Sequence, residues 1–177
     1  MHTPPEITAE TINLWLEKAV QEITGTMFAM GSYPADAPLT PKNDEEVLAA
    51  CIGTRGKCPL EVALFFPPSL VTQLACISLE VPVAELDEKM INDVAGEFSN
   101  MVVGAVKSRI SDMQIDCAMT VPRTLRGTDH SPDLNQKLRA AFAVIRGSAG
   151  PRNEATSTRT TMHFSIGNEI MRLESHF

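Results

Sequence analysis

Three polar residues whose side chains could take part in chemistry lie about one helical turn apart in the stretch NDVAGEFSNMVVGAVKSRI, residues 92–110. Three residues separate Asp93 from Glu97, and Asn100 follows after two more. On a helix, at about 100° per residue, all three side chains point to one side. A carboxylate only accepts hydrogen bonds, whereas an amide both donates and accepts without titrating. The stretch contains no nucleophile–base pair, so these residues alone do not define a reaction.

Gly104 and Ser108 extend the same polar side, and both fall within roughly 60° of Glu97 on a helical wheel. Glycine in a helix interior costs about 1 kcal/mol relative to alanine. A glycine here would allow another part of the chain, or a partner, to approach the helix closely. The plainer alternative is a solvated helix face whose glycine packs under a strand.

The opposite side of this segment is apolar, which predicts a long helix from about Ala84 to Ser111 with one face in the core. Glu85, Asp87 and Glu88 would lie in its first turn, where the helix dipole favours negative charge. The apolar stripe consists of Val94, Phe98, Met101, Val102, Ala105 and Val106.

Composition indicates a single globular domain over residues 1–177, with 44% hydrophobic and 21% charged residues. The net charge of −7 argues against nucleic acid or an anionic membrane as a partner. No run approaches the roughly 20 apolar residues that span a bilayer, and MHTPPEITAE lacks the features of an export signal. We therefore expect a cytoplasmic protein, in which Cys51, Cys58, Cys76 and Cys117 are reduced, largely buried thiols without a metal site.

The remaining patterns predict a mixed α+β fold, because strands and helices do not alternate regularly. A first helix is predicted over Glu6–Thr24, and a proline-containing loop or strand over Gly31–Asn43. VLAACIG and PLEVALFF predict a hairpin around TRGKC, and a short helix follows over Leu70–Leu79. DCAMTVPRTLRG predicts a strand in which Pro122 marks an edge position or a bulge. SAGPRNEATSTR predicts a polar loop, and TTMHFSIG predicts a strand. LNQKLRAAFAVIRG, residues 134–147, fits either a helix or a strand.

Residues 85–128 resemble the signature region of the CheX/CheC/FliY family of chemotaxis phosphatases. The family pattern is Asp or Ser, three residues, Glu, two residues, Asn, and a proline further downstream. Asp93, Glu97 and Asn100 match it, and Pro122 follows Asn100 after 21 residues, about one fewer than usual. The residues that flank this pattern in the CheX branch of the family are also matched here, at Gly96, Met101, Gly104, Ala105, Lys107 and Ser108.

The resemblance implies an antiparallel sheet with long helices packed on it, in which AAFAVIR and TTMHFSIG would both be strands. It implies a phosphatase that acts on a phosphorylated CheY-like response regulator, with Mg²⁺ on the regulator and no cofactor of its own. Asn100 would orient the attacking water, and Glu97 would dock on the regulator's active-site lysine. Asp93, Gly104 and Ser108 would contact the partner, and a homodimer through sheet edges is expected because CheX proteins are often dimers.

Several alternatives stay open. A binding or scaffold module of the same fold, without turnover, is the main one, and a flagellar-switch adaptor is a weaker third. Glu10 and Asn13 repeat the Glu-x-x-Asn spacing in the first helix, although Glu17 stands where a glycine would be expected. His130 and His163 fit structural roles better than that of a general base.

Overall fold

The computed structural model describes residues 7–35, 46–147 and 157–177. These ranges hold four α-helices, one 3₁₀ turn and the strands of a single seven-stranded sheet. In chain order the elements are α1 (Ala9–Phe28), β1 (Ser32–Pro34), β2 (Glu46–Gly56), β3 (Leu60–Phe66), α2 (Pro68–Leu79), η1 (Val83–Glu85), α3 (Glu88–Asp112), β4 (Cys117–Met119), β5 (Arg123–Thr128), α4 (Pro132–Arg146), β6 (Arg159–Ile166) and β7 (Glu169–His176).

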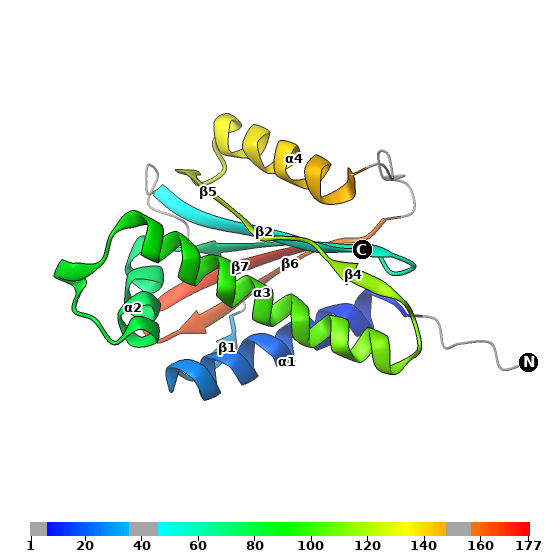
Figure 1. The fold of residues 1–177 in the computed structure, drawn as a ribbon, viewed down its shortest axis with the longest axis horizontal. Coiled ribbons are helices and arrows are strands. Elements are labelled where there is room, and N and C mark those ends of the chain that lie inside the picture. Colours follow the sequence, from blue (N-terminus) through cyan, green and yellow to red (C-terminus); the bar gives the residue numbers. More distant parts are fainter. Residues whose placement is uncertain (1–6, 36–45, 148–156) are drawn as a thin grey trace, which may run out of the picture.

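The sheet has the strand order β1-β6-β7-β3-β2-β4, and β5 also pairs with β2. Every pairing is antiparallel. Helices α1, α2 and α3 cover one face of the sheet, and α4 covers the other (Figure 1). The predicted α+β class with helices packed on an antiparallel sheet is therefore confirmed.

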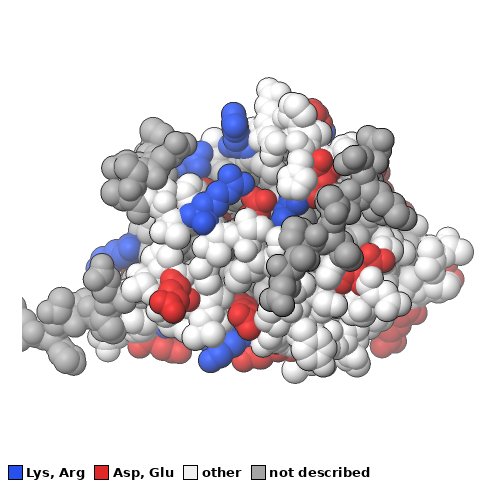
Figure 2. Space-filling view, turned by 180° about the vertical axis from the view of Figure 1, so that it is seen from behind, with Lys and Arg blue, Asp and Glu red and all other residues white. Residues whose placement is uncertain are grey.

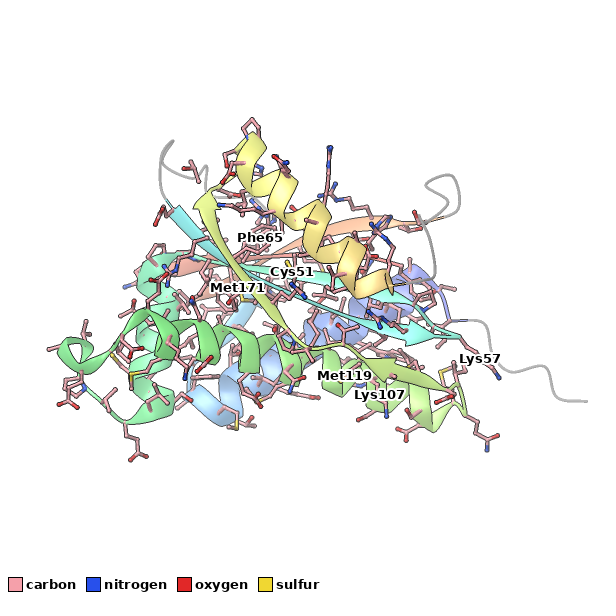
Figure 3. The ribbon with its side chains drawn as sticks, turned by 45° about the horizontal axis from the view of Figure 1, so that its top comes forward. Cys51, Lys57, Phe65, Lys107, Met119 and Met171 are labelled. Carbon is pink, nitrogen blue, oxygen red and sulfur yellow. The ribbon has the colours of Figure 1, made fainter. Side chains whose placement is uncertain are left out.

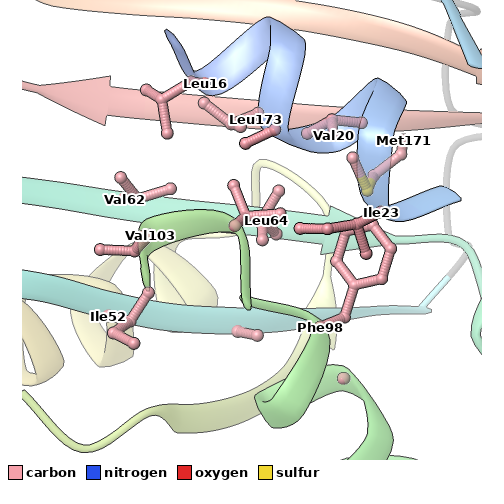
Figure 4. Close-up of a cluster of buried hydrophobic side chains, with 14 of the residues drawn as sticks. Leu16, Val20, Ile23, Ile52, Val62, Leu64, Phe98, Val103, Met171 and Leu173 are labelled. Carbon is pink, nitrogen blue, oxygen red and sulfur yellow. The ribbon is translucent and has the colours of Figure 1, made fainter. Parts of the chain in front are cut away.

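Strands β2 and β3 are the shared wall of two hydrophobic cores. All seven residues of β3 are buried, which explains its unbroken apolar run, since a strand covered on both faces needs no polar alternation. Alternate residues point to the two faces. Leu48, Ala50, Ile52, Val62 and Leu64 enter the larger core under α1–α3 (Figure 4), and Val47, Ala49, Cys51, Ala63 and Phe65 enter the smaller core under α4.

Helix α3 begins at Glu88, four residues later than the predicted start at Ala84. The Asp87 side chain accepts a hydrogen bond from the Met90 amide at 2.7 Å and so caps the helix. The residues before it form the separate turn η1. The predicted apolar stripe is confirmed at its centre, where Phe98 is fully buried and meets Phe66 edge-on with ring centroids 5.6 Å apart.

The segment of residues 134–146 is helical, so the strand that the family resemblance implied for AAFAVIR is wrong. The Ser131 side chain accepts from the Leu134 amide and caps the helix, and Pro132 fits its first turn. Successive gaps of four, three and four residues place the apolar side chains on one helical face. This buried face consists of Leu134, Leu138, Ala141 and Ile145.

The other predicted elements are confirmed with shifted ends. The hairpin is β2–β3, the short helix is α2, and TTMHFSIG forms most of β6. The first helix starts at Ala9 and continues to Phe28 rather than ending at Thr24. Most of the proline-containing loop and of SAGPRNEATSTR lies outside the described residues.

The strand around Pro122 is divided into β4 and β5, and both pair with β2 at one edge of the sheet. Met119 pairs with Thr54 and Arg123 pairs with Cys51. One side thus advances four residues (119 to 123) while the other advances three (54 to 51). This extra residue is a β-bulge, so the prediction of an edge position or a bulge at Pro122 is confirmed.

Candidate functional site

The polar residues of α3 lie on its side away from the core. Asp93, Glu97 and Ser108 are exposed, whereas Asn100 and Gly104 are half-buried. Their buried neighbours in sequence, such as Phe98 and Val102, anchor the helix in the larger core. The helix therefore brings all five predicted site residues together in one strip, which we call the α3 strip (Asp93, Glu97, Asn100, Gly104 and Ser108).

The bulged segment between β4 and β5 borders one side of the α3 strip. A Cβ added to Gly96 would lie 3.7 Å from the Pro122 Cβ, and one added to Gly104 would lie 3.7 Å from the Met119 Sδ. Figure 3 shows Met119 next to α3, close to Lys107. Asn100 lies between these two glycines in the helix, so it sits beside this border.

Helix α1 lies along the other side of α3. It makes extensive contact with α3, and near the C-terminal end of α3 Arg109 reaches the Glu22 carboxylate at 3.3 Å. The α3 strip consequently lies between α1 and the bulged edge of the sheet.

Glu97 and Asn100 differ from Asp93 in their partners. Within the ranges that the structure describes, Glu97 forms no salt bridge and the Asn100 side chain forms no hydrogen bond. Asp93 pairs with Lys89 at 3.4 Å, but both side chains are largely exposed, and such a pair contributes little. The acid and the amide at the centre of the strip are therefore available to an incoming group.

The structure answers the question that Gly104 raised in the sequence. The group that approaches it is a side chain of the protein's own fold, Met119. A methyl group at Gly104 would be in ordinary van der Waals contact with Met119 rather than in collision.

Sequence reasoning missed Met119 and Arg126, which both flank α3. The Arg126 guanidinium lies 3.0 Å from Glu88 and 3.3 Å from Asn92, near the start of the helix. The only sequence signal for this border was the position of Pro122, because the pairing of β4 and β5 with β2 is long-range.

The face of the molecule that lies behind the view of Figure 1 carries interspersed acidic and basic side chains (Figure 2).

The second Glu-x-x-Asn pair, in α1, has a different environment. The Asn13 Nδ2 donates to the Thr160 hydroxyl at 2.9 Å, and its Oδ1 accepts from the Ser175 hydroxyl at 3.1 Å. These bonds connect α1 to β6 and β7. The amide of Asn13 is used to hold the fold together, which supports a structural role.

His130 and His163 lie away from the α3 strip. His163 stands opposite Arg172 in the β6–β7 ladder, and burial, with a smaller contribution from Arg172, lowers the pKa of His163. His130 is exposed and contacts Arg172 at 3.1 Å, while the Arg172 guanidinium forms two hydrogen bonds of 2.6 and 2.7 Å with Asp129. These contacts attach the start of α4 to the sheet.

The described part of the chain contains no group of three or more His, Cys, Asp or Glu side chains that could hold a metal ion. Cys51, Cys58 and Cys117 are buried and Cys76 is half-buried, and none of the four is in a disulfide. None of the helices in the described ranges is long and apolar enough to cross a bilayer.

A sequence model of the family described as "Chemotaxis phosphatase CheX" matches residues 48–145, which is more than half of the chain. The chain belongs to the CheX family. The matched region begins in β2 and ends in α4, so it contains the whole of α3 and the bulged segment.

Solved structures of CheX proteins share the fold at low sequence identity. The chemotaxis protein CheX from Vibrio vulnificus is 17% identical, with a TM-score of 0.67, and the match covers 99% of this chain and 98% of that chain. CheX from Desulfovibrio desulfuricans is 15% identical, with a TM-score of 0.65 over 93% and 97% of the two chains. A chain of the CheX-CheY-BeF3-Mg²⁺ complex from Borrelia burgdorferi is 9% identical, with a TM-score of 0.59 over 93% and 96%. No curated protein matches the chain, and at these identities the structural likeness establishes the fold alone.

Proposed function

We propose that this CheX-family chain hydrolyses the aspartyl phosphate of a phosphorylated CheY-like response regulator. The observation that carries the proposal is the pair Glu97 and Asn100. Both lie at the centre of the α3 strip, and their side chains have no ion pair or hydrogen bond with described residues. A polar pair that the fold itself does not use fits a role towards a partner.

In the proposed reaction, a water oxygen attacks phosphorus in line with the bond to the regulator's aspartate. That P–O bond breaks, which gives inorganic phosphate and a free aspartate carboxylate, and the proton of the water leaves to solvent. Mg²⁺ bound by the regulator neutralises the phosphoryl oxygens, so what a second protein can add is the position of the water. The Asn100 amide suits this task because it donates and accepts without titrating.

Glu97 has a docking role in this proposal. Its carboxylate accepts a charge-assisted hydrogen bond from the regulator's active-site lysine and fixes α3 relative to the phosphoryl group. Asp93, Gly104 and Ser108 line the same strip and contact the regulator. The complex of a CheX with CheY from Borrelia burgdorferi supports this class of partner.

The decisive experiment follows the decay of a phosphorylated receiver domain with and without the purified protein. Each receiver domain of the same organism is charged with acetyl phosphate and Mg²⁺. The wild type should accelerate decay of at least one receiver. Asn100→Ala should reduce that acceleration at least about a hundredfold, because a misplaced reactant costs rates of this order.

Asn13→Ala is the matched control, since it removes an asparagine from the second Glu-x-x-Asn pair. It should leave the phosphatase rate unchanged while lowering thermal stability. Glu97→Ala should raise the Kd for the receiver with little change in the melting temperature. A wild type that leaves every receiver's phosphoryl lifetime unchanged would overturn the enzyme proposal, and binding without turnover would identify a scaffold instead.

A further inference from the structure

Val121 has the most exposed large apolar side chain in the described ranges, at 81%. A single exposed valine on a surface needs no explanation. Val121 differs because of its place: it precedes Pro122, which packs against Gly96, and Gly96 is the residue before Glu97.

The backbone on both sides of Val121 is fixed. Thr120 donates its amide hydrogen to the Gly53 carbonyl at 2.9 Å, and its hydroxyl accepts from the Gly53 amide at 3.0 Å. On the other side, Pro122 lies against α3 and Arg123 resumes pairing with β2 opposite Cys51. Between these two attachments, Val121 is held in place while its side chain stays in solvent.

The bulge explains how this edge of the sheet comes to display an apolar side chain. The extra residue in a bulge is left out of the ladder and re-aims the side chain there, and bulges are frequent beside active sites. Here the two residues Val121 and Pro122 oppose the single residue Ile52, by the register on either side. Pro122 covers Gly96, and Val121 remains without a cover from the described residues.

We propose that Val121 is a docking residue that contacts the apolar surface of the regulator beside its phosphoryl site. The inference rests on the proposed function for the identity of the partner. A receiver domain that brings its phosphoryl group to Glu97 and Asn100 must also cover the neighbouring border. That border is apolar at Val121 and, further along, at half-buried Met119. Glu97 supplies a charged contact, and Val121 supplies apolar area that is buried only in the complex.

The test measures the Kd for a receiver domain loaded with beryllofluoride and Mg²⁺, alongside KM and kcat for the phosphorylated receiver. Val121→Ser should raise Kd and KM about tenfold, as expected when the complex no longer buries a valine. The kcat should stay within about twofold, because Val121 does not touch the reacting atoms. Val121→Ile retains the apolar contact and should keep Kd within about threefold.

Val144→Ser is the matched control, because Val144 is an exposed valine on α4, on the other face of the sheet. It should leave Kd unchanged. An unchanged Kd for Val121→Ser, an equal rise for Val144→Ser, or a fall in kcat alone would each overturn the docking role.

The two proposals have separate failures. If the wild type binds a receiver without accelerating decay, the proposed function fails, and the Kd series still decides the role of Val121. If the wild type binds no receiver, both proposals are overturned.

Discussion

Replacing Gly104 by alanine tests whether the glycine of the α3 strip is required by the fold. Gly104 lies in the interior of α3 and has no positive φ angle, so an L-residue fits its backbone. The new Cβ would lie 3.7 Å from the Met119 Sδ and 3.9 Å from its Cε, which are ordinary contacts. The structure therefore predicts that Gly104→Ala causes no steric strain.

The expected effect is a gain in stability of about 1 kcal/mol, from the helix propensity difference between glycine and alanine. The contact of the added methyl group with Met119 adds a few tenths of a kcal/mol, since the position is only partly buried. For a chain of this length, about 1 kcal/mol corresponds to a rise of roughly 2–4 °C in the melting temperature.

Thermal unfolding followed by circular dichroism measures this shift, and Gly53→Ala is the matched control. A Cβ on Gly53 would collide with the Leu60 carbonyl oxygen and lie 2.8 Å from the Ile145 Cγ2. That variant should lose about 1–3 kcal/mol or more through overpacking. A lower melting temperature for Gly104→Ala would refute the reasoning, because it would mean that α3 and β4 pack more tightly than the contacts indicate.

Three further predictions concern assembly, acid stability and thiol reactivity. We expect a homodimer through sheet edges, so light scattering at tens of micromolar should give twice the monomer mass. Because burial lowers the pKa of His163 in the folded state, the unfolded chain binds more protons as the pH falls below about 6.5. This contribution to stability should be fully present above that pH and should decrease as the pH falls towards the folded pKa. In urea titrations at several pH values, His163→Gln should make the free energy of unfolding depend less on pH. Since burial raises the pKa of Cys51 to about 12, the native protein at pH 8 should react with Ellman's reagent first at half-buried Cys76.

Each of these predictions has a direct contradiction. A monomer mass throughout that concentration range counts against the dimer. If the free energy of unfolding of His163→Gln depends on pH as steeply as that of the wild type, another group controls acid unfolding. Rapid reaction of Cys76→Ser at pH 8 shows that a thiol the structure buries is in fact accessible.

The candidate site was predictable from the sequence because its residues lie on one element. Asp93, Glu97 and Asn100 share a helix whose opposite side is clearly apolar, and local spacing alone places them together. The border of the site was not predictable in this way. Met119 and Pro122 meet α3 only through the register of β4 and β5 on β2, and the pairing of residues about 65 positions apart leaves no local pattern.

The α4 segment shows a different limit. AAFAVIR carries the β-branched and aromatic residues of a strand, while the spacing of Leu134 and Leu138 fits a helix. The helix forms because Ser131 caps it and because one face meets the smaller core on β2 and β3. Without knowledge of that second core, the sequence did not decide between the two structures, and the family resemblance decided it wrongly.

The placement of α4 on the far side of the sheet has a practical consequence for experiments on this protein. A fluorophore or a surface tether attached to the exposed side of α4, for example at Val144, would leave the whole α3 strip facing solution. Binding of a receiver domain could then be measured on an immobilised or labelled protein whose α3 strip is unobstructed. Because the sheet separates α4 from α3, the protein can be immobilised through α4 while the α3 strip on the other face stays accessible.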